Sequence, residues 1–324
     1  MTLACFGDIH FEKLGNKIPN FNQLVSKSVR SSIDTSLDRG ATTIALLGDI
    51  FNTPYPSQDA IVTFLDILTD YPDVHFICLL GNHDYADLLI NSLKIVAWSN
   101  KIQKNIEVIS KPDIRKIGGV TYHLQPHPLC DPLSKKADFA LGHFAVNGAR
   151  GDNGFTVRTK NQPKGNWILG DFHTEQQGKV KGCRYDYLGS ITQLSWEEKP
   201  KKSFIVIEDG EKVRHRVDLS YKLIKYVLSS DEDLNSKSFE KGSYYYIQTK
   251  NGYLLPKGWL VDHPMVIRQQ AVGAKKDKRA SVLTPHELMI SPLSFLEQYL
   301  SSKKVAPDLV TKAVNIAQKI KVST

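Results

Sequence analysis

Five short apolar runs in this sequence each end at a glycine, and each glycine is followed by an aspartate, an asparagine or a histidine. These pairs are Gly7-Asp8, Gly48-Asp49, Gly81-Asn82, Gly142-His143 and Gly170-Asp171. Short apolar runs bounded by glycine are typical of buried β-strands. In open α/β sheets, ligands bind outside the carboxyl ends of the strands. The pattern therefore predicts that the five polar side chains converge at one place.

Two further histidines belong to the same pattern, because His10 follows Asp8 by two residues and His173 follows Asp171 by two. Carboxylate, amide and imidazole groups together favour Mn, Fe or Zn over an ion that takes oxygen ligands only. A single glycine–aspartate pair after a strand is more often a turn than a ligand. Serine or alanine would serve a turn equally well. A residue that can bind a metal at all five of these strand-end positions therefore favours a metal site.

The composition is that of a globular protein of about two or three domains, with 324 residues of which 41% are apolar. No apolar run approaches the roughly 20 residues of a membrane span, and the first strand begins without a leader segment. We therefore expect a cytoplasmic protein that does not enter a membrane. The four cysteines are scattered and form no C-x-x-C pair, so we expect reduced core residues.

The basic charge is concentrated in the last third of the chain. Of the formal net charge of +8, residues 218–324 carry 16 Lys and Arg against 10 Asp and Glu, a net of +6. Such an excess fits contact with a phosphate backbone, although it is also common on solvated surfaces.

The first half of the sequence alternates between strand and helix patterns. Val25, Val29, Ile33 and Leu37 recur every fourth residue, and helices are also expected at 57–69 and near 88–99. Short strands are expected later at 106–109, 114–117, 120–124, 183–188, 203–207 and 212–217, the last two joined at a hairpin. This order predicts an α/β fold in which two packed sheets are flanked by helices. The loop 144–165 is expected beside the site.

The C-terminal part divides into three segments. Residues 219–274 contain three strand-like runs, at 221–228, 244–249 and 265–272, and are expected to form a small α+β module. Residues 275–283 are expected to form a basic linker. Residues 284–324 contain proline-marked helix starts and two leucine- or alanine-rich stripes. These helices are expected either to pack on the protein or to bind a partner, because short helices need burial for stability.

The strand-end residues resemble the motif set of calcineurin-like metallophosphoesterases. The matching segments are Asp8-x-His10, Gly48-Asp49, Gly81-Asn82-His83-Asp84, Gly142-His143 and Gly170-Asp171-Phe172-His173. Within that superfamily, segments 142–149 and 187–195 are most similar to SbcD-type DNA nucleases and their phage relatives. The resemblance implies a two-sheet α/β sandwich of the metallophosphoesterase type over residues 1–218, followed by a DNA-binding cap module over 219–274.

The resemblance also implies a role for each motif residue. One divalent ion would be held by Asp8, His10, Asp49 and His173, and a second by Asp49, Asn82, His143 and Asp171. Two such ions can clamp the attacking and leaving oxygens of a phosphoryl displacement. His83 would face the scissile phosphate, as a charge stabiliser or proton donor. Asp84 would orient an imidazole.

Two positions depart from the family pattern. Asp171 stands where these enzymes usually carry histidine. A carboxylate oxygen is a harder Lewis base than an imidazole nitrogen, so the second site favours Mn²⁺, with Mg²⁺ or Fe²⁺ as alternatives, over Zn²⁺. Asn52 stands where relatives carry a group that can transfer a proton.

The leading hypothesis is a DNA nuclease that works as a homodimer with an SbcC-like coiled-coil ATPase, bound through the C-terminal helices, in a bacterial or phage-infected cell. The alternatives are a scaffold or DNA-binding protein with a degenerate site and a phosphodiesterase for small substrates.

Overall fold

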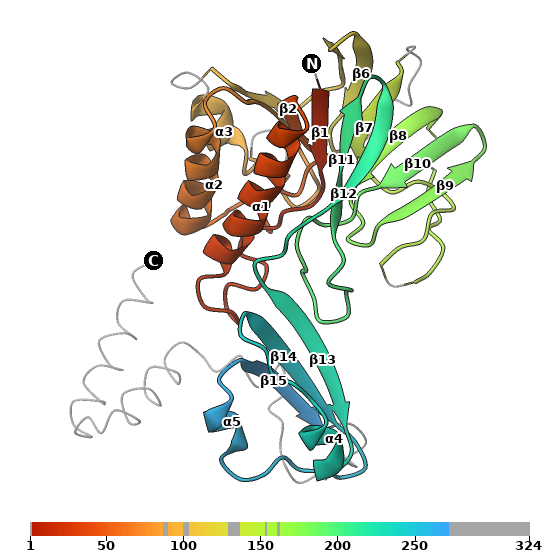
Figure 1. Ribbon diagram of the computed structural model, residues 1–324. Helices are drawn as coiled ribbons and strands as arrows, with labels where there is room; N and C mark the ends of the chain where they lie inside the picture. The colour runs from red at the N-terminus through yellow and green to blue at the C-terminus, as the bar shows by residue number, and fades with distance from the viewer. Residues whose placement is uncertain are drawn as a thin grey trace, which may run out of the picture. The chain divides into compact units, whose positions relative to one another are not determined.

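The structure is a computed structural model in which residues 2–86, 90–99, 104–128, 137–152, 154–160 and 163–271 are described. The basic linker expected at 275–283 and the helices expected at 284–324 lie outside the described residues. Fifteen strands and five helices are found in the described part of the chain (Figure 1). The strands form two sheets of six and one of three.

The first six-stranded sheet has the strand order β12-β11-β1-β2-β3-β4. Its strands are β1 (Thr2–Phe6), β2 (Ala41–Leu46), β3 (His75–Leu79), β4 (Ile106–Ile109), β11 (Ser203–Glu208) and β12 (Glu211–Arg216). Strands β1 to β4 run parallel, whereas β11 is antiparallel to β1 and to β12. The predicted hairpin between the last two strands is therefore present, at Asp209 and Gly210.

The second six-stranded sheet has the order β5-β6-β7-β8-β10-β9. Its strands are β5 (Asp113–Ile117), β6 (Val120–Gln125), β7 (Phe139–His143), β8 (Gly165–Gly170), β9 (Gln176–Val180) and β10 (Cys183–Tyr187). The four inner strands run parallel, and the two edge strands are antiparallel to their neighbours. The two mixed sheets confirm the predicted α/β sandwich.

Three helices cover the outer face of the first sheet (Figure 1): α1 (Phe21–Asp38), α2 (Gln58–Asp70) and α3 (Lys94–Ser99). The four-residue repeat of α1 faces the sheet, since Val25, Val29 and Ile33 are buried in the core there. The Ser57 side chain accepts a hydrogen bond from the Ala60 N–H and so caps α2, which is the capping role that serine favours. Helix α3 begins later than predicted because the preceding turn binds Asp84 through Ser92.

Side-chain alternation along the strands separates two cores. Leu3 and Cys5 of β1 belong to the apolar cluster that also contains residues of the second sheet, and Ala4 and Phe6 belong to the cluster with the helices. This is the period of two expected of a strand that is buried on both faces. Among the described residues, Cys5, Cys78 and Cys183 are free and buried, and no helix is both long and apolar enough to cross a bilayer.

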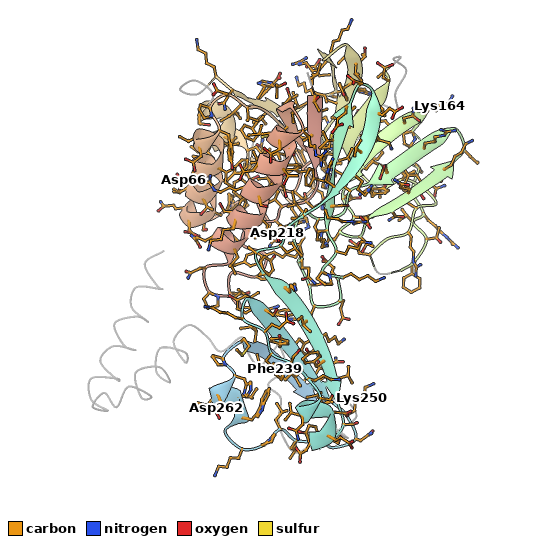
Figure 2. All side chains as sticks on the ribbon, viewed as in Figure 1. Asp66, Lys164, Asp218, Phe239, Lys250 and Asp262 are labelled. Carbon is orange, nitrogen blue, oxygen red and sulfur yellow. The ribbon has the colours of Figure 1, made fainter. Side chains whose placement is uncertain are left out.

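The predicted cap module forms a separate three-stranded sheet of β13 (Lys222–Leu228), β14 (Ser243–Thr249) and β15 (Val266–Ala271). All three strands run parallel, and the crossovers contain α4 (Asp231–Asn235) and α5 (Trp259–Asp262). Strands and helices therefore alternate along the chain in this module, whereas the predicted α+β arrangement would segregate them. Asp218 precedes the sheet, and Phe239 packs with Tyr245 and Trp259 in its core (Figure 2).

Candidate metal centre

The structure brings the predicted strand-end residues together from both large sheets. Asp8 follows β1, Asp49 follows β2, Asn82 follows β3, His143 ends β7 and Asp171 follows β8. Three groups of carboxylate and imidazole atoms lie close enough to share an ion, each within 4.8 Å. They are Asp8–His10–His173, His10–Asp49–His83 and Asp8–Asp49–His143.

The first predicted site is centred on His10. Its Nε2 atom lies 3.2 Å from Nε2 of His173 and 3.3 Å from Oδ2 of Asp49. Two ligand atoms that each lie about 2.1 Å from one ion at a right angle are about 3 Å apart. The spacing therefore fits side chains that share one divalent cation.

The second predicted site is centred on His143. Its Nε2 atom lies 2.9 Å from Oδ1 of Asn82, 3.4 Å from Oδ1 of Asp49 and 4.0 Å from Oδ1 of Asp171. Its Nδ1 atom lies 2.6 Å from the carbonyl oxygen of Leu47, so Nδ1 donates there and Nε2 points toward the cluster. Asp49 faces His10 with Oδ2 and His143 with Oδ1, which is what a bridging ligand requires. Asp171 is the most distant member.

Burial of the charged and polar groups indicates that a cation belongs in this cluster. Asp8 and His10 are fully buried, and Oδ2 of Asp8 has no hydrogen-bond partner within the described residues. An unpaired buried carboxylate oxygen is costly unless a cation neutralises it. Burial raises the pKa of Asp8 to about 7 and lowers the pKa of His10 to about 4. His10 is therefore a neutral imidazole at neutral pH, as a metal ligand must be.

Asp49 and His143 form a buried pair at the centre of the cluster. Burial alone would raise the pKa of Asp49, but the charge of His143 and hydrogen bonds from His10 and His143 lower it well below its usual value. Burial alone would lower the pKa of His143, but Asp49, Asp8 and Asp171 raise it well above its usual value. The site thus favours positive charge at the position between these residues.

Four of the predicted ligands have a strained backbone. The φ angles are 30° at Asp8, 51° at His10, 49° at Asp49 and 90° at Asp171. Residues with a side chain rarely adopt positive φ, and such strain is concentrated at functional sites, where the surrounding structure stabilises it. An ordinary turn at these positions would favour glycine, so the strain argues for a role of the side chains.

The glycines before the ligands are required by close packing. A Cβ atom at Gly48, which has a φ of 88°, would lie 2.5 Å from Nδ1 of His143. A Cβ atom at Gly81 would overlap both the backbone and the carboxylate of Asp49. The repeated glycine in the sequence therefore marks the places where one ligand packs against the backbone of another strand end.

His83 lies beside the first cluster, with its ring centroid 4.8 Å from that of His10. Its backbone N–H donates to Oδ1 of Asp49 at 2.8 Å, and its Nδ1 atom lies 3.0 Å from the carbonyl oxygen of Asn52. Donation from Nδ1 to this carbonyl leaves Nε2 for a ligand or a substrate. Because residue 52 makes the contact through its backbone, asparagine at this position keeps His83 oriented.

Asp84 has a different role from the one predicted. We expected it to orient an imidazole, but its contacts are with backbone and a hydroxyl group. Its carboxylate accepts hydrogen bonds from the N–H groups of Ile50, Phe51 and Gly81 and from Oγ of Ser92. Asp84 therefore fixes the two loops that carry Asp49, Asn82 and His83, and burial followed by the charge of Asp49 raises its pKa to about 6.

Replacing Asp84 by alanine is expected to destabilise the protein strongly. The change leaves three buried N–H groups without an acceptor, each at a cost of about 1–3 kcal/mol, so the free energy of unfolding should fall by roughly 3 kcal/mol or more. Urea denaturation measures this change. The matched control is Asp66→Ala on the exposed face of α2 (Figure 2), expected to change stability by less than about 0.5 kcal/mol. Equal effects of the two changes would contradict the assignment.

Three residues near the site were missed or misread in the sequence. Asp152, in the long loop, accepts hydrogen bonds from the N–H groups of His173 and Thr174 and so attaches the loop to a predicted ligand. Glu198 lies 3.7 Å from Nδ1 of His173. Lys202 belongs to the polar stretch 197–202, but its side chain is only 5% exposed. No local pattern marks these contacts, because each depends on residues distant in the sequence.

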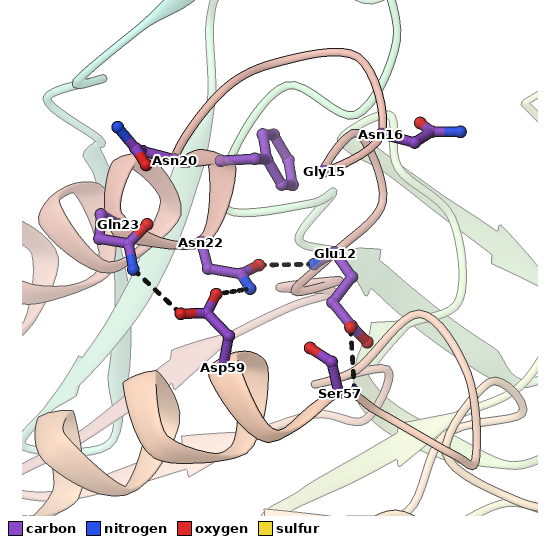
Figure 3. Close-up of a pocket in the computed structure, with 9 residues that line it drawn as sticks. Glu12, Gly15, Asn16, Asn20, Asn22, Gln23, Ser57 and Asp59 are labelled. Carbon is purple, nitrogen blue, oxygen red and sulfur yellow. Dashed lines mark hydrogen bonds between the residues drawn. The ribbon is translucent and has the colours of Figure 1, made fainter. Parts of the chain in front are cut away.

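A polar cavity of about 500 Å³ lies next to the segment that carries His10 (Figure 3). In its wall, Glu12 N–H donates to Asn22, Asn22 donates to Asp59, and Ser57 N–H donates to Glu12. These bonds connect the chain after His10 to the first turns of α1 and α2. Because these bonds join the three segments, we interpret the network as a support for the loop that presents His10; Oε2 of Glu12 has no hydrogen-bond partner among the described residues.

A two-sheet sandwich with aspartate, histidine and asparagine at the strand ends defines a metal-dependent phosphoesterase. The family model for calcineurin-like phosphoesterases matches residues 1–175, which is more than half of the 324 residues. The chain therefore belongs to the calcineurin-like phosphoesterase family, and membership implies a metal-dependent hydrolase of phosphoesters.

Two similar proteins of solved structure share low sequence identity with this chain. TT1561 of Thermus thermophilus is 11% identical with a TM-score of 0.43, over 66% of this chain and 98% of that chain. Yfce, a phosphoesterase from E. coli, is 12% identical with a TM-score of 0.32, over 64% of this chain and 89% of that chain. The comparison with curated proteins gives no significant match.

Proposed function

We propose that the protein is a metal-dependent DNA nuclease, the SbcD-like subunit of a complex with an SbcC-like ATPase in DNA repair, recombination or phage DNA metabolism. The observation that carries the proposal is a groove that begins at His173, one of the predicted ligands, and contains two exposed lysines, Lys199 and Lys201. A homodimer and binding of the ATPase through residues 284–324 follow from the resemblance to SbcD-type nucleases and are part of the same proposal.

Each residue of the cluster has a stated part in this proposal. Asp8, His10, Asp49 and His173 hold one divalent ion, and Asp49, Asn82, His143 and Asp171 hold a second, with Mn²⁺ as the favoured ion. When bound, such ions supply Lewis-acid activation of the phosphodiester and lower the pKa of bound water. His83, whose ring is oriented by the Asn52 carbonyl, protonates the leaving oxygen or stabilises charge that develops on the phosphate.

The segment 187–195 supports the nuclease assignment because it joins the site to the cap module. Gln193 Nε2 donates to the carbonyl oxygen of Leu223 at 3.1 Å, and Leu223 N–H donates to Oε1 of Gln193 at 2.8 Å. Trp196 Nε1 donates to the carbonyl oxygen of Tyr244 at 3.0 Å. The segment that resembles SbcD-type nucleases thus anchors β13 beside the sandwich, and Trp196, the residue after it, anchors β14.

Two exposed lysines line the groove next to His173. The three glutamates that also line it, Glu175, Glu197 and Glu198, are paired with Arg216, Lys225 and Lys202. A cavity of about 370 Å³ is lined by His173 to Glu175 and by Glu197 to Lys202, apart from Pro200. Lys199 and Lys201 are exposed there, while Lys202 is paired with Glu198. Two exposed cations next to a metal cluster favour a substrate that has phosphates beyond the one being cleaved.

The double charge reversal Lys199→Glu/Lys201→Glu tests the substrate class. We expect the KM for duplex DNA to rise about tenfold or more and the salt dependence of DNA binding to weaken, because up to two phosphate contacts are lost. Cleavage of the small reporter bis(4-nitrophenyl) phosphate should change by less than about twofold, because its single phosphate reaches only the metal cluster. Both substrates are assayed with Mn²⁺ and the full chain.

The matched control reverses Lys179 in β9 and Lys181 in the turn before β10, which are also exposed but lie toward the end of β9 that is farther along the chain from groove residue Glu175. This control should leave DNA cleavage nearly unchanged. Equal losses in both double variants would mean that only net charge matters. A native protein that cleaves the reporter but neither single- nor double-stranded DNA would contradict the nuclease proposal and favour a small-substrate phosphodiesterase.

A scaffold or DNA-binding protein with a degenerate site is a second candidate, and the position of Asp171 favours it. Its Oδ1 atom is 4.0 Å from Nε2 of His143, whereas the Oδ1 atoms of Asn82 and Asp49 are 2.9 Å and 3.4 Å from that nitrogen. Asp171 also belongs to none of the three close groups. This candidate requires that the purified protein binds at most one Mn²⁺ ion tightly and that added Mn²⁺ produces no hydrolysis.

A further inference from the structure

Lys202 is a buried lysine beside a predicted metal ligand. Its side chain is 5% exposed, and lysines are almost never fully buried unless they are paired. Its Nζ atom donates to Oε2 of Glu198 at 2.5 Å, to Oγ of Ser190 at 2.7 Å and to the carbonyl oxygen of His173 at 3.0 Å. The ammonium group is therefore fully hydrogen-bonded and holds three chain segments together.

Glu198 is held by this lysine and faces the imidazole of His173. Its side chain is 11% exposed, and Oε2 also accepts a hydrogen bond from the N–H of Leu194 at 3.2 Å. The other oxygen, Oε1, lies 3.7 Å from Nδ1 of His173. The carboxylate therefore lies between the ammonium group of Lys202 and the imidazole ring of His173.

The two nitrogens of His173 face different groups. Nδ1 faces Glu198, and Nε2 lies 3.2 Å from Nε2 of His10 in the first cluster. A carboxylate near one ring nitrogen favours the proton on that nitrogen and leaves the lone pair of the other for a metal. Asp152 is also 3.8 Å from Nδ1, but its oxygens already accept backbone N–H groups and its side chain is 38% exposed.

We propose that Glu198, fixed by Lys202, is a positioning residue that sets the tautomer and orientation of His173 for the first metal ion. This inference rests on the metal cluster of the proposed function and does not depend on DNA as the substrate. It also explains the buried lysine, because the bonds from Lys202 to Glu198 and to the carbonyl oxygen of His173 fix the carboxylate beside the ring.

Titration of the full-length, metal-free protein with MnCl₂ in a calorimeter, without nucleic acid, tests the proposal. In Glu198→Gln, we expect one of the two ions to bind about 10- to 100-fold more weakly, as is typical when an outer partner of a ligand is lost. The affected ion should be the one that is lost in His173→Ala. The matched control is Glu197→Gln, at the neighbouring position, whose side chain is 69% exposed and pairs with Lys225; both affinities should stay native.

A second variant separates positioning from support of the fold. Glu198→Gln leaves the Lys202 charge unpaired, whereas Glu198→Gln/Lys202→Met removes both buried charges and should recover stability. We expect the double variant to remain deficient in binding the same ion. Native affinity for two ions in either folded variant overturns the proposal, while a native protein that binds no Mn²⁺ contradicts the metal cluster itself.

A measurement on the native protein needs no variant. In ¹⁵N-imidazole NMR spectra of the Zn²⁺-loaded protein, His173 should carry its proton on Nδ1 and bind the ion through Nε2. A ring with an unprotonated Nδ1 would overturn the proposal even if neither variant folds.

Discussion

Replacing Asp49 by alanine is expected to abolish phosphodiester hydrolysis and to remove tight binding of both ions. Its carboxylate oxygens face both predicted sites, at 3.3 Å from Nε2 of His10 and 3.4 Å from Nε2 of His143. Loss of several kcal/mol of transition-state stabilisation corresponds to a fall in kcat/KM of about 10³-fold or more. Metal content and kcat/KM on a phosphodiester reporter are measured with the same preparation.

Two further variants show whether the effect comes from the charge or from the backbone. Asp209→Ala is the matched control, because Asp209 is exposed in the β11–β12 turn and has a φ of 48°, against 49° for Asp49. It should keep native activity. Asp49→Asn tolerates positive φ and can still accept the hydrogen bond from the His83 N–H, so it should fold well but bind metal poorly. Two bound ions in Asp49→Ala would contradict the bridging role.

The convergence of the candidate ligands could be predicted because each has a local mark in the sequence. A residue that follows an apolar run and a glycine must lie at the carboxyl end of a buried strand, and parallel strands bring such ends together. The resemblance then assigned roles to the residues. Asp84 shows the limit of this reasoning, since it belongs to a matching motif but binds the backbone of Ile50, Phe51 and Gly81. Motif membership does not tell a ligand from the residue that shapes its loop.

The groups around the ligands could not be predicted because they come from distant segments without a periodic pattern. The stretch 197–202 is polar and resembles a solvated turn, yet Lys202 is buried where the chain enters β11. Asp152 reaches His173 from the long loop at a sequence separation of 21 residues. Such contacts follow from the packing of the two sheets, which local sequence does not encode.

The cap module shows the same division between local and non-local information. The expected strand runs at 221–228 and 244–249 agree closely with β13 and β14, because β-branched and aromatic residues mark them. Their parallel pairing was not visible, since it depends on the crossovers. Helices α4 and α5 have only five and four residues, which is too short for a helical period to appear in the sequence.

Replacing His83 by alanine is expected to lower kcat by about 10²- to 10⁴-fold, the range typical of a lost general acid or base, while two Mn²⁺ ions remain bound. The ring makes one contact between the two loops, with the Asn52 carbonyl, while the backbone N–H of residue 83 keeps its bond to Asp49 after the change. Stability should therefore change little. Mn²⁺ calorimetry and kcat measurements on the same preparation separate the two effects.

The leaving group distinguishes the possible roles of His83. If its imidazole protonates the leaving oxygen, the loss of activity should be large for DNA and small for a 4-nitrophenyl ester, whose leaving group is stable as an anion. If it stabilises charge on the phosphate, both substrates should lose activity equally. His75→Ala, at the opposite end of β3 with a side chain 44% exposed, is the matched control and should be native. Because His83 also forms a close group with His10 and Asp49, loss of one ion in His83→Ala would instead make it a metal ligand.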